Sequence, residues 1–505
     1  MRRVFSSAAF VVALCAGATA GAQVDDRRDL RQEPATAEGA TEKAPEPKQE
    51  EDEVGLPPDA PIDSDAERAL PDYDGRGEDP TTAGDVLIWI PRVLMSPLYF
   101  VSEFVVRRPL GWLVTAVEEE KVVAKVFDFF TFGPDNNIGF APTGLIDFGF
   151  RPSVGIYFFW NDFIAKDNDL RARAATWGPD WLLFNAKDRL TVGEGHELTV
   201  RGEFLRRSDF IFHGIGPESG EEEARYQATS IQGGLLYEAE LWRSSEFKSH
   251  VTVRDVRFEP DEGCCDDRTV AQEVARGRYP LPPGMDSGYT VLSQGVTAEL
   301  DTRPRRQPRW LPDGSDYVSP NASGLRLQLR GEHASGLSTE LRTNPNAPAR
   351  DHWIKYGGSL GGYVDFAGQQ RALGLSLIAD FVDPIDEGTA IPFTELVSLG
   401  GERPMRGFLE GRLLGRSSAV AQFDYHWPIW VFVDGTFHYA VGNVFGEHLE
   451  GFEMKQLRQS FGMGFRANGS RDHVFELLLA FGSETFDQGA GIENVRFVLG
   501  TTSGF

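Results

Sequence analysis

A strict alternation runs through Leu325-Arg326-Leu327-Gln328-Leu329-Arg330, in which large apolar side chains take turns with polar ones. Successive side chains of a β-strand point to opposite faces, so this period of two predicts a strand with one apolar and one polar face. The pattern returns in residues 422–427 and 433–439, where aromatic side chains take most apolar positions. A soluble β-sandwich also alternates. Aromatic residues near strand ends favour a transmembrane barrel, which has lipid outside and a polar interior.

Sixteen segments along the chain have this character. They run near 140–150, 153–162, 169–177, 181–191, 196–206, 228–241, 246–259, 289–302, 323–335, 352–366, 371–382, 417–428, 430–443, 457–467, 473–483 and 493–505. An even number lets both ends of a barrel lie on the periplasmic side. Closure is needed because an open sheet edge in lipid would leave backbone groups unpaired. The expected fold class is all-β, a sixteen-stranded transmembrane outer-membrane β-barrel over residues 138–505.

The long connections follow odd-numbered segments, which places them outside the membrane or folded into the barrel. They are residues 206–228, 260–288, 336–351 and 383–416. The connection 303–322 breaks the rule that periplasmic turns are short.

The chain is acidic, with a formal net charge of −26 and a mean hydropathy of −0.30. A helical membrane protein would be more apolar, whereas a barrel need not be, because every second strand residue faces a polar interior. Acidity argues against a nucleic-acid partner.

The first 22 residues have the organisation of a secretory signal peptide. Arg2 and Arg3 supply positive charge, a short apolar run follows, and Ala20-Gly21-Ala22 precedes Gln23 as a cleavage site. The run is too short to span a bilayer as a mature helix. We therefore expect export, an outer-membrane location and a periplasmic N-terminal segment.

Two further segments precede the barrel. Residues 23–84 are rich in Asp, Glu, Pro and Ala, a composition that cannot bury enough apolar surface to fold, and are expected to be a disordered acidic periplasmic tether. Residues 85–132 are apolar but interrupted by prolines and charges, which predicts amphipathic interfacial helices rather than a spanning helix. A plug in the barrel mouth and a soluble helical subdomain remain alternatives.

Chemical motifs are sparse. Gly357-Gly358-Ser359-Leu360-Gly361 matches a hydrolase pattern, but that motif needs a strand–turn–helix elbow and here lies within a predicted strand. Cys264 and Cys265 are adjacent in an acidic loop, which predicts a solvated segment, with or without a bridge between them, ahead of a metal site. His426 and His438 are expected to be polar groups of the barrel wall. We expect no enzyme activity, no cofactor and no metal.

A long loop near the C-terminus carries Gly401-Glu402-Arg403-Pro404-Met405-Arg406-Gly407-Phe408. An arginine between an apolar residue and Gly-Phe is unusual in a surface loop. It is explained if the loop folds back into a wide barrel, where Arg406 can reach a carboxylate on the inner wall.

Met405-Arg406-Gly407-Phe408 resembles the signature loop of the BamA/TamA family, the bacterial surface antigen family. Five predicted strands follow the loop, as in that family, and the terminal Phe505 resembles its barrel assembly signal. Other similar stretches are Asp301-Thr302-Arg303, Leu311-Pro312-Asp313-Gly314 and His213-Gly214-Ile215-Gly216. The first two resemble the family's inner turn, which would account for the long connection 303–322.

Two departures from the family stand out. The chain has no room for the periplasmic POTRA domains of the family's assembly members. The resemblance also implies an Asp partner for the loop arginine just before a Gly-x-Val turn, but Ala440 occupies that position. We therefore expect Arg406 to pair with Asp424, with Asp434 as a second partner, in a lock that holds the loop inside the barrel. The alternative is that Arg406 lines a solvated surface loop.

The resemblance implies a function in inserting or translocating a protein or lipid client at the outer membrane, through a weak seam between the first and last strands and a thinned bilayer. A passive channel or structural barrel is the alternative, and a surface enzyme is disfavoured. The expected partners are outer-membrane lipid and an unfolded barrel or lipid client. The sequence does not identify the periplasmic partner.

Overall fold

The computed structural model describes most of the chain from residue 129 onward. The described residues are 96, 103–104, 108, 129–133, 136–220, 222–304, 321–337, 351–366, 370–402, 404–430, 433–467 and 473–503. The expected signal peptide, the tether, most of residues 85–132 and Phe505 lie outside them. All the strands belong to the unit that contains residues 102–505.

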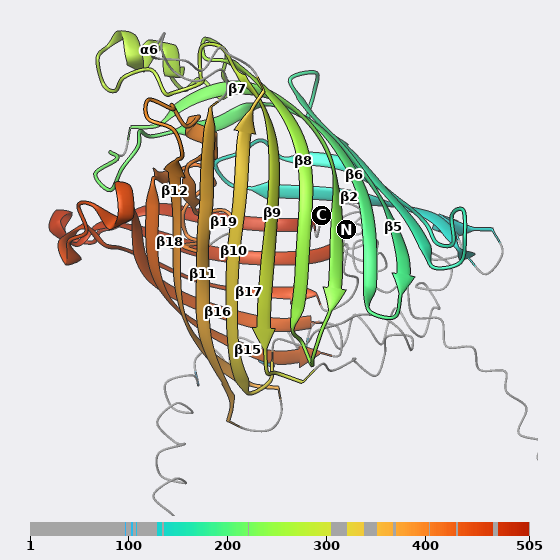
Figure 1. Ribbon diagram of the computed structural model, residues 1–505. Coiled ribbons are helices and arrows are strands. Elements are labelled where there is room, and N and C mark those ends of the chain that lie inside the picture. Colours follow the sequence, from blue (N-terminus) through green and yellow to red (C-terminus); the bar gives the residue numbers. More distant parts are fainter. Residues whose placement is uncertain are drawn as a thin grey trace, which may run out of the picture. The chain divides into compact units, whose positions relative to one another are not determined.

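Sixteen long strands form a closed antiparallel barrel (Figure 1), as the sequence predicted. They are β2 (Ile138–Asp147), β3 (Ser153–Trp160), β4 (Asn168–Thr176), β5 (Trp181–Gly193), β6 (His196–Phe212), β7 (Ala224–Glu240), β8 (Glu246–Glu259), β9 (Tyr289–Asp301), β10 (Gly324–Gly336), β11 (His352–Asp365), β12 (Ala372–Pro384), β15 (Ser417–Trp430), β16 (Val433–Phe445), β17 (Arg458–Ala467), β18 (His473–Thr485) and β19 (Ile492–Ser503). Short elements are β1 (Thr131–Phe132), β13 (Val397–Leu399), β14 (Leu413–Gly415), α6 (Val270–Ala275), η3 (Phe393–Glu395), η4 (Glu447–Leu449), η5 (Met454–Gln456) and η6 (Phe486–Gln488).

The strand boundaries agree best where the alternation is unbroken. The largest miss is at β6, which was predicted to end near residue 206 but continues to Phe212. Its pairing with β7 shifts register between Arg207 and Phe210. Such a bulge adds an unpaired residue and reverses the parity of the side chains that follow, so the alternation ends before the strand does.

Away from the end with the long connections, the strands present apolar side chains outward and polar ones inward. In β10, Leu325 is 61% exposed and Leu329 is 57% exposed on the outer face. The inward Arg326 donates to both carboxylate oxygens of Glu299 on β9, at 2.7 Å each. An apolar outer surface over a charged and hydrogen-bonded interior is the arrangement of a transmembrane barrel.

The barrel closes where β19 meets β2, and this junction is called the seam. Its ladder pairs only Leu145–Asp147 with Val498–Gly500. At the inner end of β2 the edge is partly covered by β1, which pairs with Ile138 and Gly139. The junction between first and last strands therefore has a ladder of three residue pairs.

The end of the barrel that carries the long connections is called the outer end, and it contains a buried apolar core. The core combines strand residues with residues of the connections 260–288 and 385–416. Its larger members are Phe212, Tyr226, Val256, Val270, Met285, Tyr289, Trp353, Ile391, Phe393 and Leu396. In Figure 1, α6 and its connection lie at this end. Within the described residues, none of the helices combines the length and apolar character that crossing a bilayer requires.

Candidate functional site

Residues 385–416, called the inward loop, connect β12 to β15 and form a hairpin through the pairing of β13 with β14. The hairpin and η3 are its stem, and residues 400–412 are its tip. Met405 in the tip has a left-handed backbone (φ 70°), which costs a non-glycine residue about 1–3 kcal/mol. Its side chain is fully buried in a cluster with Leu399, Phe408 and Leu413. Packing of the tip therefore holds an unfavourable backbone in place.

Arg406 reaches a carboxylate on the inner wall, but a different one from those expected. Its Nη2 donates to both oxygens of Glu476 on β18, at 2.7 Å each. Asp424 instead accepts from Gln422 at 2.7 Å, and Asp434 accepts from Asn321 at 3.0 Å. The predicted pairing of Arg406 with Asp424 and Asp434 is therefore wrong in this structure.

The physical reason for the difference is the reach of the loop. The predicted partners lie on the first strands after the loop, β15 and β16, whereas the tip passes over them to β17, β18 and β19. One signal could have identified the partner. Glu476 is the only acidic or basic residue in the apolar segment from Val474 to Ser483, and a lone carboxylate there calls for a cationic partner.

Gly407 and Phe408 fix the tip closely on the wall. The Gly407 N–H donates to Ser460 Oγ on β17 at 2.8 Å. A Cβ on Gly407 would lie 2.0 Å from the Phe481 carbonyl oxygen, so only glycine permits this approach. The Phe408 ring covers Gly482, where an added Cβ would lie 2.7 Å from the ring. Gly482 on β18 was not among the residues predicted from the sequence.

Arg496 on β19 joins the tip to the seam. Its Nε and Nη2 donate to Asp147 of β2, with distances of 2.9 Å to Oδ1 and 2.7 Å to Oδ2. Its Nη1 donates to the carbonyl oxygens of Gly401, at 2.5 Å, and of Arg406, at 3.3 Å. Neither Arg496 nor Asp147 could be predicted from the sequence, because inward charged residues are ordinary in barrel strands and nothing local distinguishes these two.

A second buried cluster holds the base of the tip. Arg412 and Arg458 are each 1% exposed, and both pair with Glu493 near the start of β19. Arg412 also donates from Nη1 to Ser219 Oγ at 3.0 Å. The base of the tip is thus joined to the outer ends of β17 and β19 and to the connection between β6 and β7.

The stem is anchored in the outer core. The Phe393 ring makes edge-on contacts with Phe212 and Tyr226, with ring centroids 5.5 Å apart in each case. Glu395, 1% exposed, pairs with Arg254 and Lys355. Burial alone would raise the pKa of Glu395, but the two cations outweigh it and hold that pKa at about 2.

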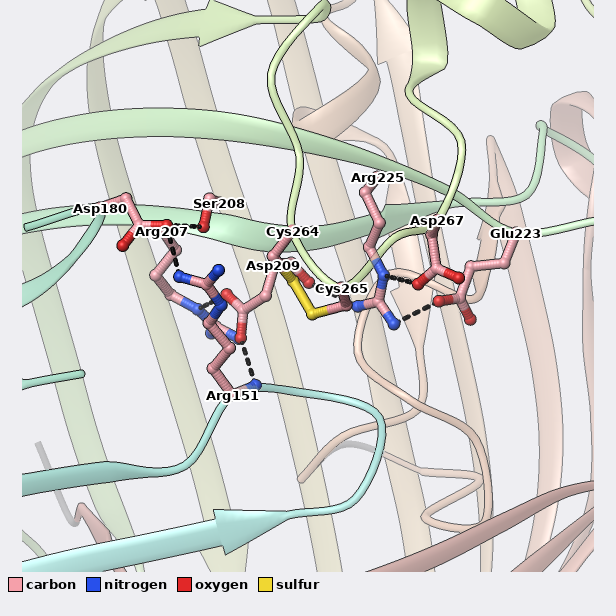
Figure 2. Close-up of a disulfide and its surroundings, with 10 residues drawn as sticks. All are labelled: Arg151, Asp180, Arg207, Ser208, Asp209, Glu223, Arg225, Cys264, Cys265 and Asp267. Atoms are coloured by element: carbon pink, nitrogen blue, oxygen red, sulfur yellow. Dashed lines mark hydrogen bonds and ion pairs between the residues drawn. A yellow bond between two sulfur atoms is a disulfide. The ribbon is translucent and has the colours of Figure 1, made fainter. Parts of the chain in front are cut away.

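The two cysteines of the connection 260–288 form a disulfide with each other (Figure 2). Of the two forms that the sequence left open, the bridged one is present. The expectation of a solvated segment is wrong for Cys264, which is 4% exposed and donates its N–H to the Ser208 carbonyl oxygen at 3.0 Å. Beside it, Arg225 bonds Asp267 at 3.0 Å and the Asp209 carbonyl oxygen at 2.8 Å. This cluster attaches the connection to β6 and β7.

The remaining expected groups lie where the sequence placed them. Ser359 is within β11 and not at an elbow. His438 faces the interior and lies 3.3 Å from Ser460 Oγ. Over the part of the chain that the structure describes, no three His, Cys, Asp or Glu side chains are grouped so as to hold a metal ion.

Comparison with known proteins finds similar solved structures. BamA from Haemophilus ducreyi lacking POTRA domains 1–3 has 12% identity and a TM-score of 0.47, over 72% of this chain and 70% of that one. CdiB from Acinetobacter baumannii has 12% identity and a TM-score of 0.43, over 72% of this chain and 59% of that one, less than two thirds of its length. The translocator domain of the autotransporter NalP from Neisseria meningitidis has 9% identity and a TM-score of 0.24, over 77% and 96%.

No protein-family model matches the sequence, and no curated protein matches it. At these identities and TM-scores the likeness does not extend to function. The similar structures include BamA, to whose family the Met405–Phe408 motif is similar. The architecture of this chain is a closed sixteen-stranded antiparallel barrel of the outer-membrane type, with a long loop folded inside it.

Proposed function

We propose that this protein assists the insertion or translocation of a protein or lipid client at the bacterial outer membrane, by opening between β2 and β19. The short ladder of the seam carries the proposal. It covers Leu145–Asp147, whereas the other edge of β19 is paired with β18 from His473 to Ser483. Each ladder bond that breaks in the membrane leaves backbone groups that lipid cannot hydrogen-bond, which costs free energy. The junction with the fewest ladder bonds therefore separates most easily.

Local sequence supports a weak seam. Pro142 lies in β2 on the inner side of the paired residues and has no N–H to give to a ladder. Proline occurs in sheets chiefly at edges. Among the described residues, the β2 edge between its β1 pairing at Gly139 and its β19 pairing at Leu145 has no ladder partner.

The two ends of the interior also support a lateral route over an axial pore. The apolar core around Phe393 occupies the outer end. The inner half is polar, with a cavity of about 350 Å³ lined by residues that include Lys187, Arg201, Glu203 and Lys248. A client entering from the periplasm would find a hydrated chamber, an obstructed outer end and a weak side wall.

The proposed partners are outer-membrane lipid and an unfolded barrel or lipid client. An extended client strand would add to the exposed β2 edge by backbone hydrogen bonds, a recognised mode of peptide binding. The proposed step exchanges hydrogen bonds and moves lipid, so it needs no bond chemistry and no catalytic residue. The N-terminal segment is proposed to lie in the periplasm.

A locked seam tests the proposal. In the variant Ile146→Cys/Leu499→Cys, the two cysteines are direct partners in the seam register. The protein is reconstituted in liposomes, and insertion of an unfolded outer-membrane barrel is followed by the appearance of its heat-modifiable folded form. We expect wild type to accelerate insertion, the oxidised variant to lose that acceleration, and a reductant to restore it.

The matched control is Leu360→Cys/Leu377→Cys, a partner pair between β11 and β12 whose residues are both exposed on the outer face. Its oxidised form should remain active. Insertion at the wild-type rate with the seam locked would overturn lateral opening. A steady ion conductance with no acceleration by wild type would replace the proposal with a passive channel.

A further inference from the structure

We infer that the tip of the inward loop is a strap across the inner side of the seam, and that Arg496 couples release of the tip to separation of β19 from β2. The inference rests on the proposed function, because it concerns how the same seam is held shut. It depends on which strands the tip contacts, on how one guanidinium is shared, and on the shortness of the ladder beneath.

The tip is anchored on both sides of the seam. On the β19 side, Arg406 bonds Glu476 of β18 and Gly407 bonds Ser460 of β17. On the β2 side, Leu409 lies against Gly149, just after β2, where an added Cβ would be 2.5 Å from the leucine Cδ1. A segment that contacts the strands on both sides of the seam resists separation of β19 from β2.

Arg496 occupies the crossing point and is 4% exposed. A guanidinium offers five N–H donors in one rigid plane. Arg496 uses the Nε edge and Nη2 for Asp147 across the seam, and Nη1 for the carbonyl oxygens of Gly401 and Arg406. Because the group is planar, Arg496 cannot turn to follow the tip without changing its geometry toward Asp147.

The seam depends on this contact more than other junctions do. The β9–β10 junction also has a two-fold arginine–carboxylate pair, Arg326 with Glu299, but its ladder extends from Asp301 to Val291. At the seam the backbone contribution is small, so the Arg496–Asp147 pair supplies much of the attachment. Removal of a partner from a buried pair leaves a desolvated charge uncompensated.

Coupling between two sites is reciprocal. Withdrawal of the tip removes two acceptors from Arg496 and loosens its hold on Asp147. Loss of Asp147 frees Arg496 and thereby loosens the tip. The effect of losing Asp147 on the tip is the sharper test. Asp147 lies on the β2 side of the seam, whereas Glu476, the carboxylate that anchors Arg406, lies on the β19 side.

The experiment uses the full mature chain in liposomes without a client. Spin labels at Ile156→Cys and Val495→Cys, both exposed on the outer face on opposite sides of the seam, report seam width by electron–electron resonance. A single label at Glu410→Cys, an exposed tip position, reports tip mobility. We expect Asp147→Asn to raise the mobile fraction of the tip label by about fivefold or more, and Arg406→Gln to broaden the seam distances.

The control is Arg326→Gln, which removes a two-fold arginine–carboxylate pair from the β9–β10 junction and should change neither signal. The Asp147 and Arg406 variants test both directions of the coupling while leaving Arg496 itself in place. The coupling would be overturned if Arg406→Gln made the tip mobile but left the seam distances unchanged. It would also be overturned if the tip stayed ordered in Asp147→Asn. The spin-label experiment contains no client, so it tests the coupling separately from insertion activity. If the coupling is observed but the protein does not accelerate insertion, the proposed function is refuted and the inference about the strap is not.

Discussion

The stem and the tip of the inward loop are held in different ways. The stem is packed into the apolar core of the outer end, where Phe393 and Leu396 are buried. The tip also buries Met405 and Phe408, but directional contacts join it to the strands beside the seam, from Arg406 to Glu476 and from Arg496 to its carbonyl oxygens. Apolar burial is non-directional and is lost only gradually as surfaces separate, whereas hydrogen bonds fail over a short displacement. The stem is therefore suited to permanent attachment, and the tip to release.

Removal of the stem's main aromatic anchor should have the largest effect. Phe393→Ala deletes a ring that is 1% exposed, and such changes typically cost about 3–5 kcal/mol. We expect a large fall in the thermal unfolding temperature, measured by heat modifiability on gels. Phe486→Ala, at an exposed ring, is the control and should have little effect. Equal melting of the two variants would contradict the stem's role.

Acid should have the second largest effect, by removing the ion pairs that Glu395 makes in the stem. The pKa of Glu395 lies at about 2 in the folded protein, below the ordinary glutamate value of about 4.3. At a pH above the pKa of the unfolded state, this depressed pKa stabilises the fold, and that contribution, roughly 3 kcal/mol, is lost as the pH falls from about 4.3 through 2. The melting temperature should drop across this window. Glu395→Gln should be less stable at neutral pH and should show a flatter acid limb.

The seam beneath the tip can be destabilised without changing the contacts of the stem or of the tip. A Cβ on Gly500 would lie 2.1 Å from the Gly144 carbonyl oxygen across the seam. Gly500→Ala should therefore destabilise closure by about 1–3 kcal/mol, the usual range for overpacking. The readout is the seam distance between spin labels at Ile156 and Val495. Gly331→Ala, where an added Cβ meets nothing within 4 Å, should leave that distance unchanged.

Loss of the tip's own ion pair should have the smallest effect on stability and a clear effect on mobility. Arg406→Ala removes two charge-assisted bonds to Glu476, worth about 1–3 kcal/mol. The barrel should still assemble, with a mobile tip and a modestly lower melting temperature. Arg406→Lys should recover part of the order. An unaltered melting profile and unchanged protease sensitivity of the loop would argue against the inward anchor.

Much of the barrel could be predicted because barrel patterning is local. The alternation of Leu325–Arg330 reports lipid on one side and a polar interior on the other, whatever the neighbouring strand is. Prediction failed where pairing alters the local pattern, as at the bulge between Arg207 and Phe210. The candidate site could be predicted only in part. Arg406 was identified from its odd setting, but its partner is 70 residues away along the chain.

Sequence alone determined that this chain forms sixteen amphipathic strands and that Arg406 needs a carboxylate inside the barrel, because side-chain period and charge burial act at the level of single residues. Tertiary structure alone decided that Glu476 and not Asp424 is that carboxylate. It also decided that Arg496 and Asp147 meet over a three-residue ladder. Those outcomes depend on how far the loop reaches and on where the first and last strands close, which are distances set by the whole barrel.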